Sequence, residues 1–278
     1  MYYTDTQIKI LQAIAKYKYM TVSQLDILQI LKHKVSLYRV LTKLKSSSKA
    51  LINYQDFNFN PKIGKLEQLL YLSKYGKNLL VEELGIDEHT IKAPTSNTLI
   101  NQDYFHRVWT IDFHIYLDIF LKKESGVIYM FDYYFDKAKR LKGAKYTRAR
   151  NRIDIKVNQK FIIPDAVIKL RYKTKEYLYL FEQHNSKDSG KIITQILNHC
   201  LVIQESGAKE KYKFDRNSRV IIVFEFESTK SAVIKKVKNN QSLQKFKNFF
   251  LLKTHTDLKQ LCFNDGWTNL HGEKIDFF

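Results

Sequence analysis

The sequence predicts a protein of mixed α+β or α/β class with two domains in series. Its 278 residues are enough for two compact hydrophobic cores. Apolar residues make up 44% of the chain, and nine Gly and three Pro are few, so the composition does not suit a disordered chain. Helical and strand-like periodicities also alternate along the sequence. We therefore expect folded domains in which helices pack against strands.

The first 86 residues predict three short helices, a hairpin and a fourth helix. Apolar residues recur at helical spacing from Asp5, again after Met20 and again after Lys34. Strand-like segments over 50–54 and 68–72 flank a loop that contains Pro61 and Gly64, and 74–84 returns to a helical pattern. This order is typical of a winged helix-turn-helix domain, whose third helix enters the major groove of DNA. We predict such a domain over residues 1–86.

The third helix has the residues that DNA contact requires. Cations suited to phosphates and polar groups suited to base edges occupy the positions that its leucines leave available. These residues are His33, Lys34, Ser36, Tyr38, Arg39, Thr42, Lys43 and Lys45. The alternatives are an ordinary solvated basic face in a helical bundle, or a winged helix that contacts another protein. The basicity favours DNA.

A second domain is expected from residue 103 to residue 278. Residues 87–102 before it lack clean periodicity and contain Pro94, Ser96 and Asn97, which predicts a linker. The expected elements are a helix over 104–122, strands over 127–135, 160–170 and 176–182, a helix over 190–204, a strand over 219–226, a helix over 230–238, a strand over 249–253 and a helix over 256–262. The domain therefore reads α, β, β, β, α, β, with a further helix and strand appended.

The chain is strongly basic, since 47 Lys and Arg against 28 Asp and Glu give a net charge of +19. This excess favours nucleic acid as the partner. A coding bias toward AT-rich codons also raises Lys, but it does not explain why acids are so few. The densest cationic segment contains Lys137, Lys139, Arg140, Lys142, Lys145, Arg148, Arg150, Arg152 and Lys156. We expect it to stay outside the core and to clamp the DNA backbone, or else to form a solvated loop.

Several features bear on the compartment. Cys200 and Cys262 are too few for a disulfide scaffold or a four-cysteine zinc site, and we expect both to be buried. The most apolar long stretch, 104–121, contains charged residues and does not suit a membrane-spanning helix. The N-terminus lacks the basic and then apolar regions of an export signal. We expect a cytoplasmic protein with no membrane partner.

Two acidic residues occur in strand-like, largely apolar segments. Asp165 follows Pro164 within 161–169, and Glu182 lies within 177–184. A carboxylate beside a sheet core is tolerated mainly when it is paired, hydrogen-bonded or bound to a cation, and two converging carboxylates suit Mg²⁺. Side chains alternate along a strand, so His184 shares a face with Glu182. The alternative is a buried Asp in a turn and a Glu satisfied by a nearby Lys or Arg.

This spacing resembles a known nuclease motif. Pro164–Asp165 and then Glu182-Gln183-His184, on consecutive expected strands before a helix, resemble the PD-(D/E)XK core of restriction endonucleases. The preceding winged helix, the segment FHR that opens the long helix, and the run FEQHNSKDSGKIITQIL resemble the replication-relaxation family. That family includes proteins of plasmid and mobile-element DNA processing. The chain is also similar to relaxases that use this nuclease core.

The resemblance implies a role for each matching position. Asp165 and Glu182 would hold Mg²⁺ or Mn²⁺, which polarises the scissile phosphate and activates a water molecule. The family has Lys at the third motif position, where this chain has His184, a residue that can serve as a ligand or a base. Lys169, on the same strand face as Asp165, is the candidate for a displaced catalytic cation. Weaker candidates for the site are Asp112, Lys187, Lys191, Gln195 and His199.

The leading hypothesis is a relaxase-like endonuclease of a plasmid or other mobile element that binds DNA and nicks it with Mg²⁺ or Mn²⁺. A covalent route through one of the 18 tyrosines stays open. The alternative is a catalytically inactive replication accessory or regulator that retains the nuclease fold for DNA binding. A third, weaker hypothesis is a replication initiator that only opens DNA. Beyond DNA, a second copy of the chain and other DNA-processing or mobilisation proteins are further candidate partners.

Overall fold

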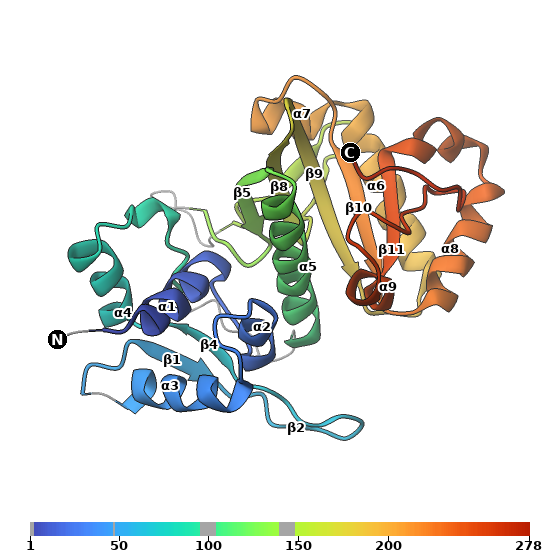
Figure 1. Cartoon of the computed structure of the whole chain (residues 1–278). Coiled ribbons are helices and arrows are strands. Elements are labelled where there is room, and N and C mark those ends of the chain that lie inside the picture. The colour runs from blue at the N-terminus through green and yellow to red at the C-terminus, as the bar shows by residue number, and fades with distance from the viewer. Residues whose placement is uncertain (1–2, 47, 95–103, 139–147) are drawn as a thin grey trace. The chain divides into compact units, whose positions relative to one another are not determined.

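The computed structural model describes residues 3–46, 48–94, 104–138 and 148–278, and the chain divides into two compact units (Figure 1). The first unit is Met1–Ile115 and the second is Tyr116–Phe278. Helices occur together with a mixed five-stranded sheet, so the predicted mixed α/β class is confirmed. Among the residues described, no helix is both long enough and apolar enough to cross a membrane.

The first unit contains three helices, two small antiparallel sheets and a fourth helix. Its elements are α1 (Asp5–Tyr17), α2 (Val22–Ile27), α3 (Lys34–Ser46), β1 (Ile52–Gln55), β2 (Phe59–Asn60), β3 (Gly64–Lys65), β4 (Leu69–Leu72) and α4 (Lys74–Asn78). Thr4 and Thr21 each close a capping box at the start of α1 and α2, which satisfies amide groups that a helix start leaves without partners. Strand β1 pairs with β4, while β2 and β3 form a separate short hairpin.

Helix α5 (Tyr104–Lys123) begins in the first unit, so the division of the chain falls later than the predicted linker over 87–102. The side-chain amide of Gln24 donates to Asp112 Oδ1 at 2.8 Å and to the carbonyl of Val108 at 2.9 Å. The ring of His114 packs edge-on against Tyr17, with 4.8 Å between the ring centres. These contacts join the first half of α5 to the core of α1 and α2. Residues 95–102 of the predicted linker lie outside the residues described.

The second unit is built around one five-stranded sheet. Its elements are β5 (Val127–Tyr133), β6 (Ile153–Ile155), β7 (Lys160–Ile162), β8 (Ala166–Tyr172), β9 (Lys175–His184), α6 (Ser189–Gln204), α7 (Gly207–Tyr212), β10 (Arg219–Phe224), α8 (Glu227–Lys238), β11 (Phe250–Thr254) and α9 (His255–Gln260). The strand order is β11-β10-β9-β8-β5. Strands β9, β10 and β11 are parallel, and β8 is antiparallel to both of its neighbours.

One face of this sheet carries the main core. Apolar residues of β8, β9 and β10 pack there with the inner faces of α6 and α8 (Figure 1). Strand β10 is buried along nearly its whole length, as expected for a strand covered on both faces. The packing places the end of β9 next to α6, which follows it in the sequence.

The structure corrects two sequence predictions about this unit. The expected strand over 160–170 is interrupted at Pro164, which has no N–H for the ladder, and its first part, β7, pairs with β6 instead of joining the sheet. The segment from Lys137 to Lys156 was predicted to stay outside the core, and this was wrong for Ile153 and Ile155, each 1% exposed.

The two cysteines differ in their environment. Cys200 on α6 is buried, as predicted, and packs within the main core. Cys262, which follows α9, is exposed, so its predicted burial was wrong. The segment after α9 turns back along β11, where Thr268 bridges Leu252, and this brings Cys262 to the surface beside the buried Phe263.

Candidate functional site

The two acidic residues of the motif lie at the same end of neighbouring strands. Ala166 is opposite Phe181 in the antiparallel pair of β8 and β9, so the next positions outward are Asp165 and Glu182. The backbone amide of Gln183 donates to Asp165 Oδ2 at 2.7 Å. The two acidic residues are only 8% and 5% exposed. The sequence prediction that these two carboxylates come from adjoining strands therefore agrees with the pairing.

Glu182 has a buried histidine as its partner. Nε2 of His199 lies 2.7 Å from Glu182 Oε1, and His199 is 1% exposed. Burial lowers the pKa of His199 to about 4, although the charge of Asp165 opposes this shift. The imidazole is therefore neutral near pH 7, and a neutral ring facing a carboxylate donates its Nε2–H.

The other two predicted catalytic residues lie in different surroundings. His184 is buried two positions beyond Glu182, opposite Phe224 of β10, and the two rings are 5.8 Å apart. Lys169 donates from Nζ to the carbonyl of Tyr212 at 2.5 Å. It stands four residues from Asp165 along β8, which corresponds to roughly 13 Å at the rise of a strand. The structure therefore brings His184 near the acidic pair but directs Lys169 toward the end of α7.

Two of the weaker candidates, Asp112 and Lys187, are engaged elsewhere. Asp112 accepts a hydrogen bond from Gln24 in the first unit. The ammonium group of Lys187 lies 5.0 Å from the ring centre of Phe226. His199 differs from these two, since the helical repeat of Ile192, Ile196 and Ile203 places it on the buried face of α6. This repeat is visible in the sequence and could have raised His199 from a weak candidate to a strong one.

Helix α3 presents part of its predicted DNA-contact set to solvent. Tyr38, Arg39 and Lys43 are exposed, and Ser36 is half-buried. Lys34 is held within the unit, because its Nζ donates to Ser23 Oγ at 2.8 Å and lies 3.4 Å from Glu67 Oε1. The exposed members of the predicted contact set are therefore His33, Tyr38, Arg39, Thr42 and Lys43.

The cationic segment of the second unit is described only in part. Its residues Lys139, Arg140, Lys142 and Lys145 lie outside the residues described. Arg150 Nη1 lies 3.5 Å from Asp132 Oδ1, and Arg152 Nε lies 2.7 Å from Asp154 Oδ1. Arg148 is exposed. Two of these arginines thus have an acidic neighbour on the same unit.

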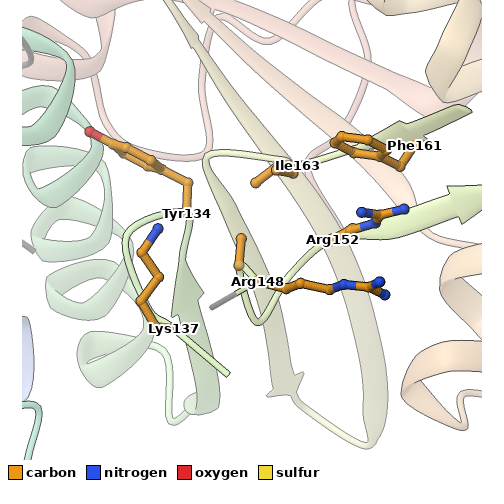
Figure 2. A pocket seen from close by; sticks show the side chains of 7 residues that line it. Tyr134, Lys137, Arg148, Arg152, Phe161 and Ile163 are labelled. Carbon is orange, nitrogen blue, oxygen red and sulfur yellow. The ribbon is translucent and has the colours of Figure 1, made fainter. Parts of the chain in front are cut away.

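A pocket of about 330 Å³ opens beside this segment (Figure 2). Its lining residues are Tyr134, Lys137, Arg148, Ala149, Arg152, Phe161 and Ile163. The backbone amide of Tyr134 donates to the carbonyl of Asp165 at 2.9 Å, and Ile163 precedes Asp165 by two residues. The pocket wall is therefore joined directly to the strand end that carries the acidic pair.

The acidic pair meets the minimum requirement for a divalent ion. Mg²⁺ is commonly bound by one or two carboxylates together with substrate phosphates and water, rather than by a full protein cage. Asp165 and Glu182 supply two such carboxylates. Among the residues described, no group of three His, Cys, Asp or Glu is arranged to hold a metal ion. Two carboxylates alone would need phosphate and water to complete the coordination of a divalent ion.

No family model, curated protein or solved structure matches this chain. The resemblance to the replication-relaxation family therefore stays a prediction. The function has to be inferred from the acidic pair, the pocket and the exposed cations.

Proposed function

We propose that this chain is a DNA-binding, metal-dependent endonuclease that nicks DNA in the manner of a plasmid or mobile-element relaxase. The observation that carries the proposal is the meeting of Asp165 and Glu182 at one end of β8 and β9. The order of the sheet strands and long helices, α5, β5, β8, β9, α6, β10, supports the assignment of a PD-(D/E)XK-like domain, because Glu182 lies in β9 and Asp165 lies directly before β8. The order of elements in the first unit likewise supports a winged helix-turn-helix.

The residues around the acidic pair have complementary tasks in this proposal. Asp165 and Glu182 would hold Mg²⁺ or Mn²⁺, which when bound polarises the scissile phosphate and lowers the pKa of a water molecule. The amide of Gln183 and the ring of His199 orient one oxygen of each carboxylate. Burial of the pair removes competing water, which strengthens its interaction with a cation. His184, two positions from Glu182, is the nearest candidate for moving a proton at the reacting phosphate.

The first unit would supply DNA affinity. Arg39 and Lys43 on α3 are exposed and can contact phosphates, while Tyr38 beside them can reach base edges. The hairpin of β2 and β3 carries Lys62 and Lys65 at the surface. Helix and hairpin together suit a duplex site recognised apart from the place of cleavage.

The test is conversion of supercoiled plasmid to open circles in Mg²⁺ or Mn²⁺. We expect the Asp165→Asn and Glu182→Gln variants to nick at least about 100-fold more slowly, because each loses a charge that holds the ion. Glu176→Gln is the matched control, since Glu176 is an exposed acid on the same strand β9. Nicking at the wild-type rate by both site variants would contradict the proposal.

A second candidate function is a DNA-binding accessory that lacks catalysis. The observation that favours it is the absence of the motif lysine, since His184 takes that position and Lys169 is bonded to the Tyr212 carbonyl. A protein of this kind would bind plasmid and leave it supercoiled with every divalent metal. Retained DNA affinity without open circles would therefore select the accessory role over the nuclease.

A further inference from the structure

The pocket beside the cationic segment combines positive charge with aromatic surface. Among the residues described, its lining includes three cations and two aromatic rings and contains no acidic side chain. In Figure 2 the side chains of Arg148, Arg152 and Phe161 lie on one side of the pocket, and those of Tyr134 and Lys137 lie on the other. A volume of about 330 Å³ falls at the lower end of the range for small-ligand sites. Such a site suits a ligand that is both anionic and flat.

Phe161 and Arg152 form a stacked pair, here called the platform, on one wall. The guanidinium carbon of Arg152 lies 3.9 Å from the centre of the Phe161 ring. Asp154 fixes the guanidinium from the side, with 2.7 Å between Arg152 Nε and Asp154 Oδ1. Phe161 is 46% exposed, so part of this pair is open to solvent. Aromatic rings and arginine planes are the surfaces on which unpaired bases stack.

The backbone that presents these side chains is firmly anchored. Nζ of Lys211 on α7 donates to the carbonyls of Arg150 and Arg152 at 2.7 and 2.5 Å. The amide of Ala138 donates to the carbonyl of Arg148 at 2.9 Å, and Asn151 donates to the carbonyl of Pro164. The described cations of this segment thus stand on a fixed scaffold. A merely solvated loop would not need these bonds.

We propose that this pocket takes one unpaired nucleotide of a DNA strand. The base stacks on the platform of Phe161 and Arg152, and the phosphates on either side of it contact Lys137 and Arg148. A paired base is stacked inside the duplex and cannot enter, so the pocket selects single-stranded or locally opened DNA. This inference rests on the proposed function. The link between the two is that Tyr134, in the pocket wall, donates its backbone amide to the carbonyl of Asp165, a residue of the proposed metal site. It adds that the strand to be cut is unpaired next to the scissile phosphate.

Binding without metal tests the pocket separately from cleavage. The full chain is titrated in EDTA into a fluorescein-labelled oligothymidylate, into the same strand with one central abasic site, and into a duplex that contains the same strand. Fluorescence anisotropy gives each dissociation constant. We expect the single strand with all of its bases to bind at least about fivefold tighter than the abasic strand, because one stacked base contributes a factor of this size.

Variants identify the wall that makes the contact. Phe161→Ala should weaken binding of the complete single strand at least about fivefold and leave the abasic strand unchanged. Arg148→Ala should weaken both strands and reduce the slope of log affinity against log salt by about 1. Tyr129→Ala is the matched control, since Tyr129 is an aromatic residue of the same unit that is 50% exposed and lies outside the pocket. Thermal unfolding checks that each variant is folded.

Two results would overturn the inference. The first is equal affinity for the complete and abasic strands, with no effect of Phe161→Ala. The second is an oligouridylate RNA that binds at least about tenfold tighter than the DNA, which would assign the pocket to RNA. Loss of plasmid nicking alone would count against the proposed nuclease, whereas discrimination between complete and abasic strands would still support the pocket.

Discussion

Helix α3 in the first unit and the β8–β9 end in the second unit hold their charged residues in opposite environments. Arg39 and Lys43 are exposed on α3, whereas Asp165 and Glu182 are at least 92% shielded from solvent. Exposed cations attract phosphate through water and keep their ordinary hydration, so their effect depends on salt. Buried carboxylates require fixed partners, which here include His199 and the Gln183 amide. Variants on α3 should therefore change affinity, and variants at the strand end should change the rate.

After the acidic pair itself, the largest effect is expected at His199. His199→Ala removes the group bonded to Glu182 and should slow plasmid nicking about 10- to 100-fold, as is usual when the partner of a metal-binding residue is lost. DNA affinity in EDTA should stay within about twofold of the wild type, because the ring is buried and cannot itself contact DNA. His199→Gln retains a donor and should recover part of the rate. If His199→Ala lowered DNA affinity as much as the nicking rate, the expected separation between binding by α3 and catalysis at the β8–β9 end would be wrong.

A smaller effect, on affinity alone, is expected from α3. The double variant Arg39→Ala/Lys43→Ala should weaken duplex binding about tenfold and reduce the salt slope by about 2, since two phosphate contacts are lost. Lys34→Met is the matched control, because the ammonium of Lys34 is already bonded to Ser23 and Glu67. Fluorescence anisotropy at several salt concentrations gives both quantities. If Lys34→Met weakened duplex binding equally, the distinction between the exposed cations Arg39 and Lys43 and the internally bonded Lys34 would be wrong.

The smallest effect concerns the stability of the first unit in mild acid. Burial lowers the pKa of His114 well below its usual 6.5, with Lys92 and Lys16 adding to the shift. The unfolded chain then binds the proton more tightly, so the free energy of unfolding decreases as the pH falls below about 6.5. Between about pH 6.5 and 5.5 we expect a decrease of about 1 kcal/mol that His114→Gln abolishes. Urea unfolding in a Trp267→Phe background measures it, because Trp109 then reports the first unit alone.

Sequence patterns predicted most elements because their periodicity is local. Strands β9 and β10 and helix α6 match the expected segments within a few residues. The short strand β6 was missed because cations surround it, although buried Ile153 and Ile155 alternate with exposed Asp154 and Lys156 in a strand-like pattern. The high positive charge of the whole segment obscured this two-residue alternation of apolar and charged side chains.

The acidic pair was predictable and its neighbours were less so. The spacing of Asp165 and Glu182 on consecutive strands is a sequence feature, but the bond from His199 depends on how α6 packs back on the sheet. Likewise, nothing local indicates that Lys169 bonds to the carbonyl of Tyr212, which is 43 residues away. The side chains of Phe161 and Tyr134 line one pocket, and Phe161 belongs to β7, which pairs with β6 and is not part of the five-stranded sheet. Long-range packing decides these contacts.

Helix α5 limits where the chain can be divided. Its first half holds Gln24 and Tyr17 through Asp112 and His114, while its second half stacks Phe120 on the rings of Phe263 and Phe278. A fragment that ends before residue 104 therefore leaves buried groups of the first unit without cover, and one that begins after residue 115 loses the helical support of its own aromatic cluster. Fragments meant to fold independently need overlapping ends that each retain residues 104–123.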